Sequence, residues 1–576
     1  MRSAAIPPLT QTLTTACALV ALAAGVTAAT DPEPRLFPLP TFASWAGVNS
    51  SAGPILFTSL TFRPPPGAVV LAAAAARYHA IILRARQSNR RPRGNANIDY
   101  PVAFAVAEHD APLSPGATDE SYEIVADATG ATITAPTQWG ALKALETFSQ
   151  LVHARGGGVH SLPAPPIKVT DRARFGYRGL MIDTSRRFLT VTAIKQALDA
   201  MAYCKLNVLH WHMVDDQSFP VESTALPKLA GLGAYSPMHT YSHADLGEVV
   251  AYARARGIAV LPEFDIPGHT SSWQIGYPYL SSRCANPRLS QHPLDPTRES
   301  TYALIQTLLA EIDPLFGDEF PFWHMGGDEV AYGCWQNSTG GYVDAYMAAN
   351  GIAKGDYAAL QAHFEQRVVA IVHKLPSKKR TVLWEDSSTS HTAGLPQDAV
   401  IELWQEHGGD ASVVDATVKA GRQIIYTTPD WYFSQHQGAA KQYQEVADWE
   451  FVYTVDPYIN STLPTSELDH AFLGGESAMW SPYFDSANFL TQAFPRAAAV
   501  AERLWSAQNV TEVYDAGLRL HAWRCRLLRR GLATAPVTGG LAIGSFGTAP
   551  PHIPHDGGHC ADGPWEVTYT PPWGAL

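Results

Sequence analysis

Short apolar runs alternate with longer amphipathic segments over most of the chain. The apolar runs predict eight strands, at residues 179–183, 208–214, 259–265, 320–325, 381–384, 400–404, 423–426 and 472–479. Helical periodicity lies between most of them, as in 246–256 and in 193–205, where one face carries Ile194, Ala197, Leu198 and Met201. This alternation predicts an α/β fold, and eight such units predict a (β/α)8 TIM barrel with insertions. A doubly wound open sheet shows the same alternation and is the alternative.

The polar residues that follow the predicted strands favour the barrel, because a barrel builds its site at the carboxyl ends of its strands. Acidic residues and one tryptophan lie at or just after these ends: Asp183, Asp215, Asp265, Asp328, Glu385, Glu406, Asp430 and Trp480. We therefore expect these side chains to face one common site.

A smaller α/β domain is predicted to precede the barrel, over residues 30–168. Its strands are expected at 69–71, 80–84 and 120–125, its helix at 138–154, and a linker at 163–166. The segment 88–94 is basic and interrupted by Pro and Gly, so an exposed loop is expected there. The barrel domain is assigned to 169–535, with final helices at 494–505 and 514–530. The tail, 536–576, is expected to pack on the barrel.

The first 29 residues are typical of a secretory signal peptide, with Arg2, an apolar run over 16–24 and small residues at Thr27-Ala28-Ala29. That run is too short to span a membrane, and no later stretch qualifies. The sequence thus predicts a protein of the secretory pathway, either in a vacuole or lysosome or outside the cell. Glycosylation sequons agree with this prediction, at Asn49, Asn337, Asn460 and Asn509.

Of the six cysteines, Cys17 lies in the predicted signal. Cys204 lies in an apolar segment and is expected to be a buried thiol. In an oxidising compartment the remaining four are interpreted as two disulfides, Cys284 with Cys334 and Cys525 with Cys560. Spacing alone does not determine this connectivity.

Composition narrows the class of protein. Hydrophobic residues make up 46% and charged residues 16%, which is typical of a globular protein with a sizeable core. A net charge of −12 argues against a nucleic-acid partner. The 15 tryptophans suit either sugar rings or core packing, because Trp combines a flat apolar face with one polar group.

The stretch Trp323-His-Met-Gly-Gly-Asp-Glu-Val330 carries the clearest chemistry. It follows the apolar run 320–322, and its two glycines allow a sharp bend or a close backbone approach. Asp328 and Glu329 come directly after them. Burial and mutual repulsion are expected to raise the pKa of each, and a carboxyl group that is partly protonated near neutral pH suits a general acid. A solvated pair at a strand end is the alternative interpretation.

Several blocks resemble the β-N-acetylhexosaminidases of glycoside hydrolase family 20, over about residues 170 to 535. One block, His324-Met-Gly-Gly-Asp-Glu329, contains the adjacent acids Asp328 and Glu329, here called the doublet. The others are Arg178-Gly-Leu-Met-Ile-Asp-Thr-Ser-Arg186, Leu206-Asn-Val-Leu-His-Trp-His-Met-Val-Asp-Asp216, Leu261-Pro-Glu-Phe-Asp-Ile-Pro-Gly-His269, and Gly474-Gly-Glu-Ser-Ala-Met-Trp480 continuing to Ala501-Glu-Arg-Leu-Trp505. The order of the blocks is that of the family.

The resemblance implies a retaining enzyme that removes terminal non-reducing β-linked GlcNAc or GalNAc. It further implies substrate-assisted catalysis, in which the sugar's own acetamide oxygen attacks to give an oxazolinium intermediate. Glu329 matches the general acid/base, Asp328 the residue that holds the acetamide N–H, and Tyr432 the residue on the acetamide oxygen. No cofactor and no metal are implied.

Further site residues follow from the same resemblance. Arg186 matches the arginine on the sugar's O3 and O4, although a salt bridge to Asp183 is its alternative. Asp215 and His269 match a relay that tunes the acid. The aromatic box around the acetamide methyl group matches Trp384, Trp404 and Trp480. The implied partners are oligosaccharides or glycoconjugates with terminal β-N-acetylhexosamine, and a homodimer, because relatives are often dimers.

Two positions depart from the family pattern. Ser434 stands where relatives often have Asp or Asn, and Pro482 stands where many have Glu. These side chains contact O4 and O6, so the preference between GlcNAc and GalNAc stays open. A basic residue near Gln435 that would favour negatively charged substrates is not evident.

Three other functional classes remain as alternatives. A metallohydrolase would use His210-Trp-His212 with Asp215 or Asp328. A conventional two-carboxylate glycosidase would pair Glu329 with a nucleophile among Glu385, Glu406 and Glu476. A sugar-binding protein without catalysis is the third, and the presence of Asp328, Glu329 and Tyr432 argues against it.

Overall fold

The computed structural model describes residues 34–46, 52–83, 98–156, 158–285, 292–317, 320–386, 395–405, 411–433, 449–458, 461–537 and 560. Several predicted features lie outside these residues. They are the signal peptide, the loop at 88–94, nearly all of the tail 536–576, and Asn49, Glu406, Ser434, Gln435 and Asn460.

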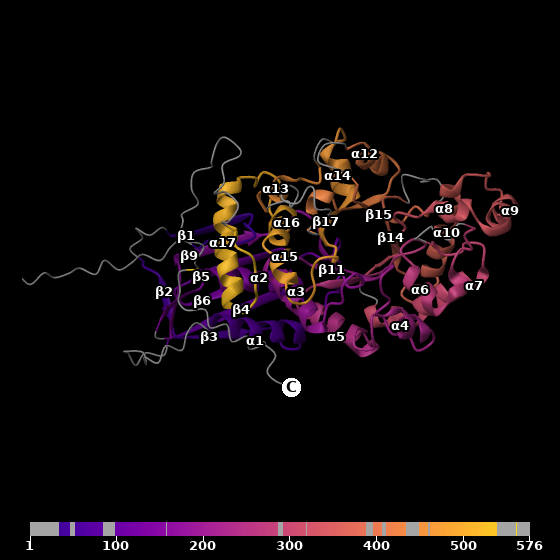
Figure 1. The fold of residues 1–576 in the computed structure, drawn as a ribbon. Helices are drawn as coiled ribbons and strands as arrows, with labels where there is room; N and C mark the ends of the chain where they lie inside the picture. Colours follow the sequence, from indigo (N-terminus) through magenta and orange to yellow (C-terminus); the bar gives the residue numbers. More distant parts are fainter. Residues whose placement is uncertain are drawn as a thin grey trace, which may run out of the picture. The chain divides into compact units, whose positions relative to one another are not determined.

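Within the described residues, eight parallel strands close into a barrel in chain order (Figure 1). Pairing of the first strand with the last completes the ring. The strands are β10 (Tyr177–Asp183), β11 (Val208–Val214), β12 (Ala259–Phe264), β13 (Phe322–His324), β14 (Arg380–Trp384), β15 (Val400–Leu403), β16 (Gln423–Tyr426) and β17 (Phe472–Met479). The predicted TIM barrel is confirmed, and the open sheet is wrong.

Helices lie between and after the barrel strands, and the predicted ones are present. The α-helices are α3 (Val191–Tyr203), α4 (Lys228–Gly233), α5 (His243–Arg254), α6 (Ser271–Gly276), α7 (Glu299–Ile312), α8 (Tyr332–Gln336), α9 (Tyr342–Ala349), α10 (Tyr357–Val372), α12 (Ser412–Lys419), α13 (Trp449–Thr454), α14 (Thr465–Ala471), α15 (Phe489–Ala493), α16 (Arg496–Trp505) and α17 (Val513–Arg529). Short 3-10 turns are η1 (Pro278–Leu280), η2 (Asp313–Phe316), η3 (Thr339–Gly341) and η5 (Pro429–Trp431).

Two helices begin earlier than their apolar periodicity predicted, because a side chain caps each amino end. The Thr190 hydroxyl accepts the Ala193 N–H before α3. A capping box between Ser242 and Asp245 starts α5. Such caps satisfy backbone N–H groups that have no partner within the helix.

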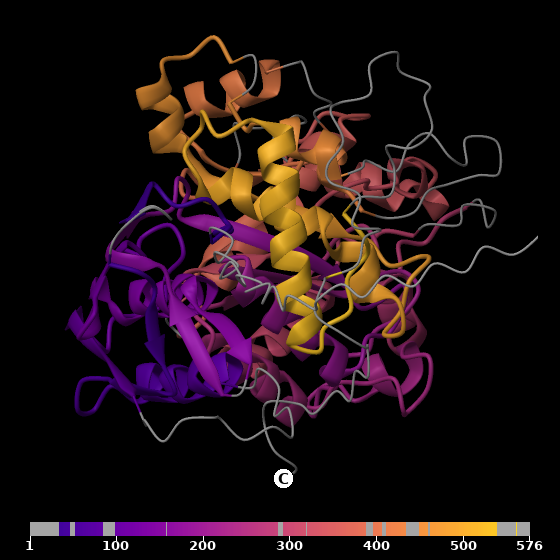
Figure 2. The same ribbon diagram turned by 90° about the vertical axis from the view of Figure 1, so that its left-hand side faces the viewer.

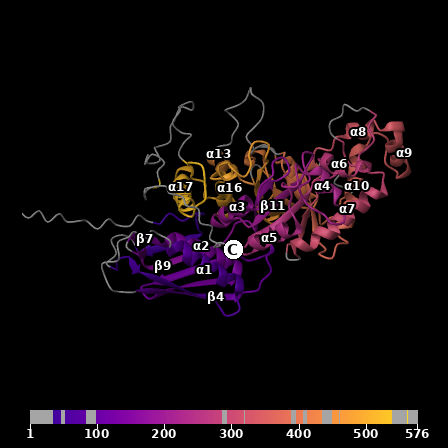
Figure 3. The same cartoon turned by 60° about the horizontal axis from the view of Figure 1, so that its bottom comes forward.

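The described residues of the preceding domain form two sheets and two helices. Figure 3 shows this domain in indigo to purple. Its six-stranded sheet has the order β1 (Phe42–Ala46), β9 (Ala164–Asp171), β5 (Tyr122–Asp127), β6 (Gly130–Thr137), β4 (Asp99–Glu108) and β3 (Ser59–Arg63). Its three-stranded sheet has the order β2 (Ile55–Phe57), β8 (Val159–Leu162) and β7 (His153–Gly156). The helices are α1 (Val69–Leu83) and α2 (Gln138–Leu151).

Three predictions for this domain are wrong. The strands expected at 69–71 and 80–84 form one helix, α1, because the alanine-rich segment between them favours a helix and buries Leu71, Ala74 and Tyr78 at helical spacing. The expected linker at 163–166 is the start of β9, which pairs with β1 and β5. The helix expected to reach 154 ends at Leu151, and β7 follows it. The domain limits at 29, 168 and 535 remain predictions.

Contacts with this domain lie at the amino ends of the barrel strands. Its core is continuous with strand-start residues such as Val208 and Ala259. Lys205 lies three residues before β11, and its buried ammonium group is 2.8 Å from Asp171 at the end of β9. Helix α17 is the long yellow helix at the centre of Figure 2. Directly after it, Arg530 Nη1 is 2.8 Å from Oε2 of Glu146 on α2. The carboxyl ends of the strands, where a site is expected, are at the opposite end of the barrel.

Both predicted disulfides are confirmed, Cys284–Cys334 and Cys525–Cys560. Cys204 is free and buried, as predicted. The predicted glycosylation residues Asn337 and Asn509 are exposed. Among the helices in the described part of the chain, none has both the length and the apolar character needed to cross a bilayer.

Candidate active site

The two glycines after β13 bring its backbone against the end of β12. Gly326 and Gly327 have φ values of +66° and +102°, a region that side chains with a Cβ rarely occupy. A Cβ at Gly326 would lie 1.7 Å from Asp265 Oδ1. The Gly327 N–H donates to the same oxygen at 3.1 Å. The close approach expected from the sequence is therefore present.

The two acids that follow occupy different environments. Asp328 is buried, with 8% of its surface exposed. Its Oδ1 is also buried and accepts no N–H group of the described residues. The Glu329 side chain is 55% exposed, and its backbone is left-handed, with φ of +49°. The doublet thus provides one buried acceptor and one accessible carboxyl group.

The pKa values of the two carboxyl groups move in opposite directions. Burial raises the pKa of Asp328 and Asp386 adds to this, while His269 and a hydrogen bond with the Asp265 carboxyl group oppose it. A hydrogen bond from His269 lowers the pKa of Glu329 and outweighs its partial burial. The expectation that both values are raised is therefore wrong for Glu329, because its side chain is half exposed and faces an imidazole.

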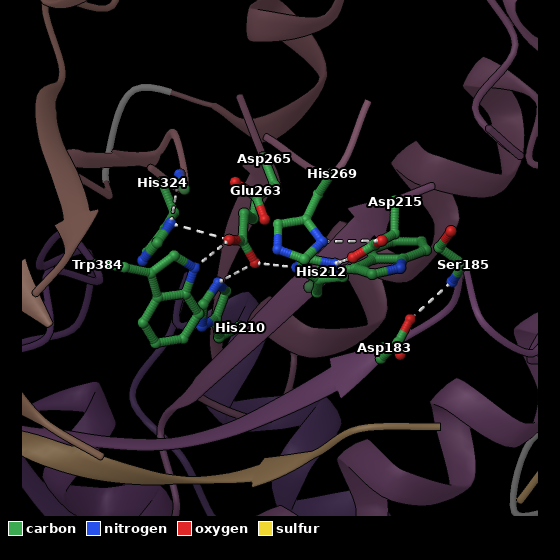
Figure 4. Close-up of polar contacts among 12 residues, drawn as sticks. Asp183, Ser185, His210, His212, Asp215, Glu263, Asp265, His269, His324 and Trp384 are labelled. Atoms are coloured by element: carbon green, nitrogen blue, oxygen red, sulfur yellow. Dashed lines mark hydrogen bonds and ion pairs between the residues drawn. The ribbon is translucent and has the colours of Figure 1, made fainter. Parts of the chain in front are cut away.

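His269 connects both acids to Asp215. Its Nε2 lies 3.6 Å from Asp328 Oδ2 and 3.5 Å from Glu329 Oε2. Its Nδ1 lies 3.2 Å from Asp215 Oδ1 (Figure 4). Burial alone would lower the pKa of His269, but the carboxylates of Asp328, Asp265 and Asp215 raise it well above its ordinary value. A cationic imidazole thus stands between the acids.

Arg186 forms the predicted salt bridge and a second one. Its Nη1 lies 3.3 Å from Asp183 Oδ2, and its Nη2 lies 2.8 Å from Asp215 Oδ2. The guanidinium carbon is 4.8 Å from the ring centroid of Trp480. The side chain keeps 18% of its surface exposed. The salt-bridge alternative is realised, and the guanidinium remains accessible beside a tryptophan.

The predicted aromatic residues form a connected group. The ring centroids of Trp384 and Trp480 are 6.1 Å apart, and those of Trp480 and Tyr432 are 6.2 Å apart. Tyr432 stacks on Trp404 at 6.4 Å with nearly parallel planes. Trp384 is buried, whereas the other three rings are partly exposed. Four rings from the ends of β14, β15, β16 and β17 are thus brought together.

Asp386 was not predicted, although it links the acids to the aromatic group. Its Oδ1 accepts the Glu329 N–H at 3.2 Å, and its Oδ2 accepts the Trp404 indole N–H at 2.7 Å. The adjacent Glu385, which was predicted, accepts the backbone N–H groups of Trp404 and Gln405, both at 2.8 Å. The sequence could have identified Asp386 as a site residue, because it also follows a predicted strand.

Two of the three candidate nucleophiles of a two-carboxylate enzyme are buried and bound to other groups. Glu385 is 2% exposed and accepts a backbone N–H group of the segment that follows β15. Glu476 is completely buried and is bound to His210 and Tyr177. Asp430, which was expected at the site only as a strand-end acid and not as a nucleophile, lies in η5, where its N–H donates to the Thr428 hydroxyl. The third candidate, Glu406, lies outside the described residues.

The histidines proposed for a metallohydrolase are bound to carboxylates. His212 Nε2 lies 2.8 Å from Asp215, and its Nδ1 is hydrogen-bonded to Glu263. His210 Nδ1 lies 2.7 Å from Glu476. Some of these groups are close enough to hold an ion. The Arg186 guanidinium, 3.4 Å from His212 Nε2, already supplies positive charge there, so the donor set fits a hydrogen-bond network better than a cation site.

Comparison with known proteins agrees with this site. A family model described as "Glycosyl hydrolase family 20, catalytic domain" matches residues 175–508, and one described as "beta-acetyl hexosaminidase like" matches residues 36–151. The beta-hexosaminidase subunit beta of Felis catus is 36% identical over 469 residues, covering 80% of this chain and 84% of that protein. The Homo sapiens subunit beta is 36% identical over 472 residues, covering 81% of each. Among solved structures, Flavobacterium johnsoniae chitobiase has a TM-score of 0.73 at 27% identity, covering 86% of this chain and 73% of that one.

A closed β/α barrel with acids, an arginine and tryptophans at its strand ends, matched by these relatives, defines a glycoside hydrolase. The chain belongs to glycosyl hydrolase family 20. The resemblance found in the sequence and the fold that it implied are therefore confirmed.

Proposed function

We propose that the protein is a retaining exo-β-N-acetylhexosaminidase that removes terminal non-reducing β-linked GlcNAc or GalNAc by substrate-assisted catalysis. One observation carries this proposal, the different environments of the two adjacent acids. The buried Asp328 has a carboxylate oxygen that accepts no N–H group of the described residues, and the accessible Glu329 lies beside it at the same imidazole. One acid is suited to hold an N–H group, and the other is suited to exchange protons.

Substrate assistance explains why the acids are neighbours. An ordinary retaining glycosidase places its two carboxyl groups about 5–5.5 Å apart, on opposite sides of the reacting carbon. Asp328 and Glu329 both approach His269 Nε2, so they enter from the same side. In the proposed reaction, the acetamide oxygen supplies the nucleophile on the other side.

Glu329 carries both proton transfers. As the acetamide oxygen bonds to the anomeric carbon, the bond to the leaving oxygen breaks and Glu329 protonates that oxygen. The Glu329 carboxylate then takes a proton from water, whose oxygen attacks the anomeric carbon and reopens the oxazolinium ring. Two displacements at one carbon give retention. The exposure of Glu329 supports this role, since water must reach it.

Asp328 and Tyr432 hold the acetamide group. The Oδ1 atom of Asp328, which accepts no N–H group of the described residues, accepts the acetamide N–H and stabilises the positive charge that develops on the ring. The Tyr432 hydroxyl donates to the acetamide oxygen. Burial raises the pKa of Tyr432 well above its ordinary value, so the hydroxyl stays protonated. The aromatic box that encloses the methyl group consists of Trp384, Trp404 and Trp480.

Arg186 binds O3 and O4 of the sugar, and Asp215 with His269 sets the charge beside Glu329. The accessible guanidinium between Asp183 and Trp480 supports the first role. The contacts from Asp215 through His269 to Glu329 support the second. These interactions fix the non-reducing end of the sugar against the strand ends, which suits cleavage of terminal residues.

We further infer that the protein is exported and dimeric. Two disulfides and the exposed sequon residues Asn337 and Asn509 support passage through the secretory pathway. The relatives from Felis catus and Homo sapiens are named as subunits, which supports an oligomer. Deglycosylation with mass spectrometry and light scattering of the purified protein test these two inferences.

Kinetics on matched aryl β-glycosides test the proposed function. Substrates with GlcNAc, GalNAc, glucosamine and glucose differ at C2 and C4 alone. We expect hydrolysis of the two N-acetyl substrates and almost none of the other two, with the β-anomer of the sugar released first. Equal turnover of the glucoside or release of the α-anomer would contradict the proposal, and the two N-acetyl rates measure the preference at C4.

A further inference from the structure

A single buried carboxylate, Glu263 on β12, lies beneath the candidate active site and binds several side chains. Figure 4 shows four interactions that meet at its two oxygens. The Trp384 indole N–H donates to Oε1 at 2.8 Å, and His324 Nδ1 lies 3.2 Å from the same atom. His212 Nδ1 is hydrogen-bonded to Oε2, and His210 Nε2 lies 3.1 Å from it. Glu263 is completely buried.

One group of contacts leads from Glu263 to the acid/base. His212 uses its other nitrogen, Nε2, to contact Asp215 Oδ2 at 2.8 Å. Asp215 Oδ1 then lies 3.2 Å from His269, whose Nε2 lies 3.5 Å from Glu329. Each imidazole in this series stands between two carboxylates. Charge at Glu263 therefore bears on the proton affinity of Glu329 through two imidazoles and one carboxylate.

The other group leads to the proposed acetamide box. Trp384 is 1% exposed, and its ring lies 6.1 Å from Trp480 and 4.7 Å from His324. A buried indole N–H needs an acceptor, and Glu263 supplies it. The orientation of the Trp384 ring thus depends on the same carboxylate that holds His212.

We propose that Glu263 is a positioning residue that couples the proton relay of Glu329 to the acetamide box, because its two oxygens hold His212 and Trp384 at once. The proposal rests on the proposed function, since it assigns both groups their roles. Glu263 itself touches no substrate. It acts by fixing the tautomer and charge of His212 and the plane of the Trp384 ring.

The charged groups around Glu263 balance one another. Burial alone would raise the pKa of Glu263, but the three histidines lower it well below its ordinary value. Burial alone would lower the pKa of His212, but Glu263 and Asp215 raise it to about 9. Further charged or titratable groups lie around this layer. They are Asp265 directly after the same strand, and Arg186, Asp328, Glu402 and Glu476 on neighbouring strands or the loops that follow them.

Glu263→Gln tests the coupling with little change in shape. The amide oxygen still accepts the Trp384 N–H, and the amide nitrogen donates to His212, but the negative charge is lost. The loss of that charge favours a neutral His212, which leaves the Asp215 carboxylate less compensated; because Asp215 raises the pKa of Glu329, that pKa increases in the variant. We expect the alkaline limb of the kcat/KM profile to move to higher pH by about one unit, with kcat/KM at the optimum falling roughly tenfold.

The second readout is the choice of N-acyl group. A less firmly held Trp384 should enlarge the box, so the preference for N-acetyl over N-propanoyl substrates should fall several-fold in Glu263→Gln. Glu476→Gln is the matched control, because Glu476 binds His210 in the same buried layer without touching His212 or Trp384. The control should change neither the alkaline limb nor the N-acyl preference.

Two further variants separate the two groups of contacts and serve if Glu263→Gln folds poorly. His212→Gln should move the alkaline limb alone, and Trp384→Phe should lower the N-acyl preference alone. In Glu263→Gln, a uniform loss on all substrates with both readouts unchanged would overturn the coupling. Failure of the proposed function is distinct, because the wild-type enzyme would then hydrolyse substrates regardless of the N-acyl group.

Discussion

Two layers of histidines and carboxylates lie one above the other in the barrel, and they have different properties. The lower layer includes His210 and Glu263, and each has 0% of its surface exposed. The upper layer includes Asp265 two residues later on the chain, together with Asp328 and Glu329 after β13. In the lower layer Glu263, Glu402 and Glu476 each lie within 3.3 Å of a histidine nitrogen, whereas the upper layer ends in an acid, Glu329, whose side chain is 55% exposed.

The difference shows where reactivity lies in a network of similar groups. Buried charges are stable only when they are paired, and paired groups change their protonation with difficulty. Groups at the edge of the network keep one unused atom for a substrate. We therefore assign orientation and charge balance to the lower layer and chemistry to the upper layer.

Glu329→Gln is the strongest test of this assignment. The amide cannot donate or accept the proton, so kcat should fall by roughly 10² to 10⁴ while substrate binding persists. Steady-state kinetics with an aryl β-GlcNAc measure kcat, and calorimetry with GlcNAc measures binding. A kcat near that of the wild type would show that Glu329 is not the general acid/base.

Asp328→Asn should have the next largest effect. The amide cannot stabilise positive charge on the oxazolinium ring, so kcat should fall by about 10² to 10³. Rates on a GlcNAc substrate with a very good leaving group should fall as well, because that substrate needs less acid assistance but still needs the acetamide to attack. If the variant matched the wild type on both substrates, the acetamide role would be refuted.

His269→Asn tests the electrostatic link within the upper layer. His269 lowers the pKa of Glu329, so its removal should raise that pKa. The first step needs Glu329 protonated, and the alkaline limb of the kcat/KM profile should therefore move to higher pH. We also expect roughly a tenfold loss at the optimum, from the lost hydrogen bond to a charged group. An unchanged alkaline limb would show that His269 does not control Glu329.

Asp386→Asn tests the link between the doublet and the aromatic group. The amide can accept one of the two hydrogen bonds, from Glu329 N–H or from the Trp404 indole, less strongly than the carboxylate does. We expect kcat/KM to fall up to about tenfold, with the larger share in kcat. Gln405→Ala is the control, because it removes a third contact to Asp386 and leaves the other two. Equal effects of the two changes would contradict the link.

Glu402→Gln probes the lower layer, where activity should change least. Glu402 is buried, accepts the Thr427 hydroxyl at 2.7 Å, and lies 3.3 Å from His324. Loss of its charge should lower the free energy of unfolding by about 1–3 kcal/mol and leave kcat within about twofold. Denaturant unfolding and steady-state kinetics measure the two quantities. A large loss of kcat in a stable variant would contradict the assignment of orientation and charge balance to the lower layer and of chemistry to the upper layer.

The sequence predicted the upper layer well, because its residues lie in short motifs directly after apolar strands. Asp328, Glu329 and His269 are recognisable from neighbouring residues alone, and the barrel brings their strand ends to one side. The two glycines were informative for the same reason, since the contact of Gly326 with Asp265 is a local requirement of the backbone.

Features that depend on contacts between distant strands were not predicted. The binding of Glu263 to His212 and Trp384 follows from the register of β11, β12 and β14, which no local pattern specifies. The lowered pKa of Glu329 likewise needs the position of His269. In the preceding domain, α1 was misread because Val69 and the residues around Ile82 have strand propensity, whereas burial follows the helical period.

The central claim is that the substrate's N-acetyl group is the nucleophile and that Asp328 and Glu329 serve it. A thiazoline that mimics the bicyclic intermediate tests this claim most directly, with mass spectrometry of the enzyme after reaction with a slow fluorinated β-hexosaminide. We predict competitive inhibition with a Ki well below KM and no sugar attached to the protein. Weak inhibition together with a covalent sugar on a carboxylate would contradict the account.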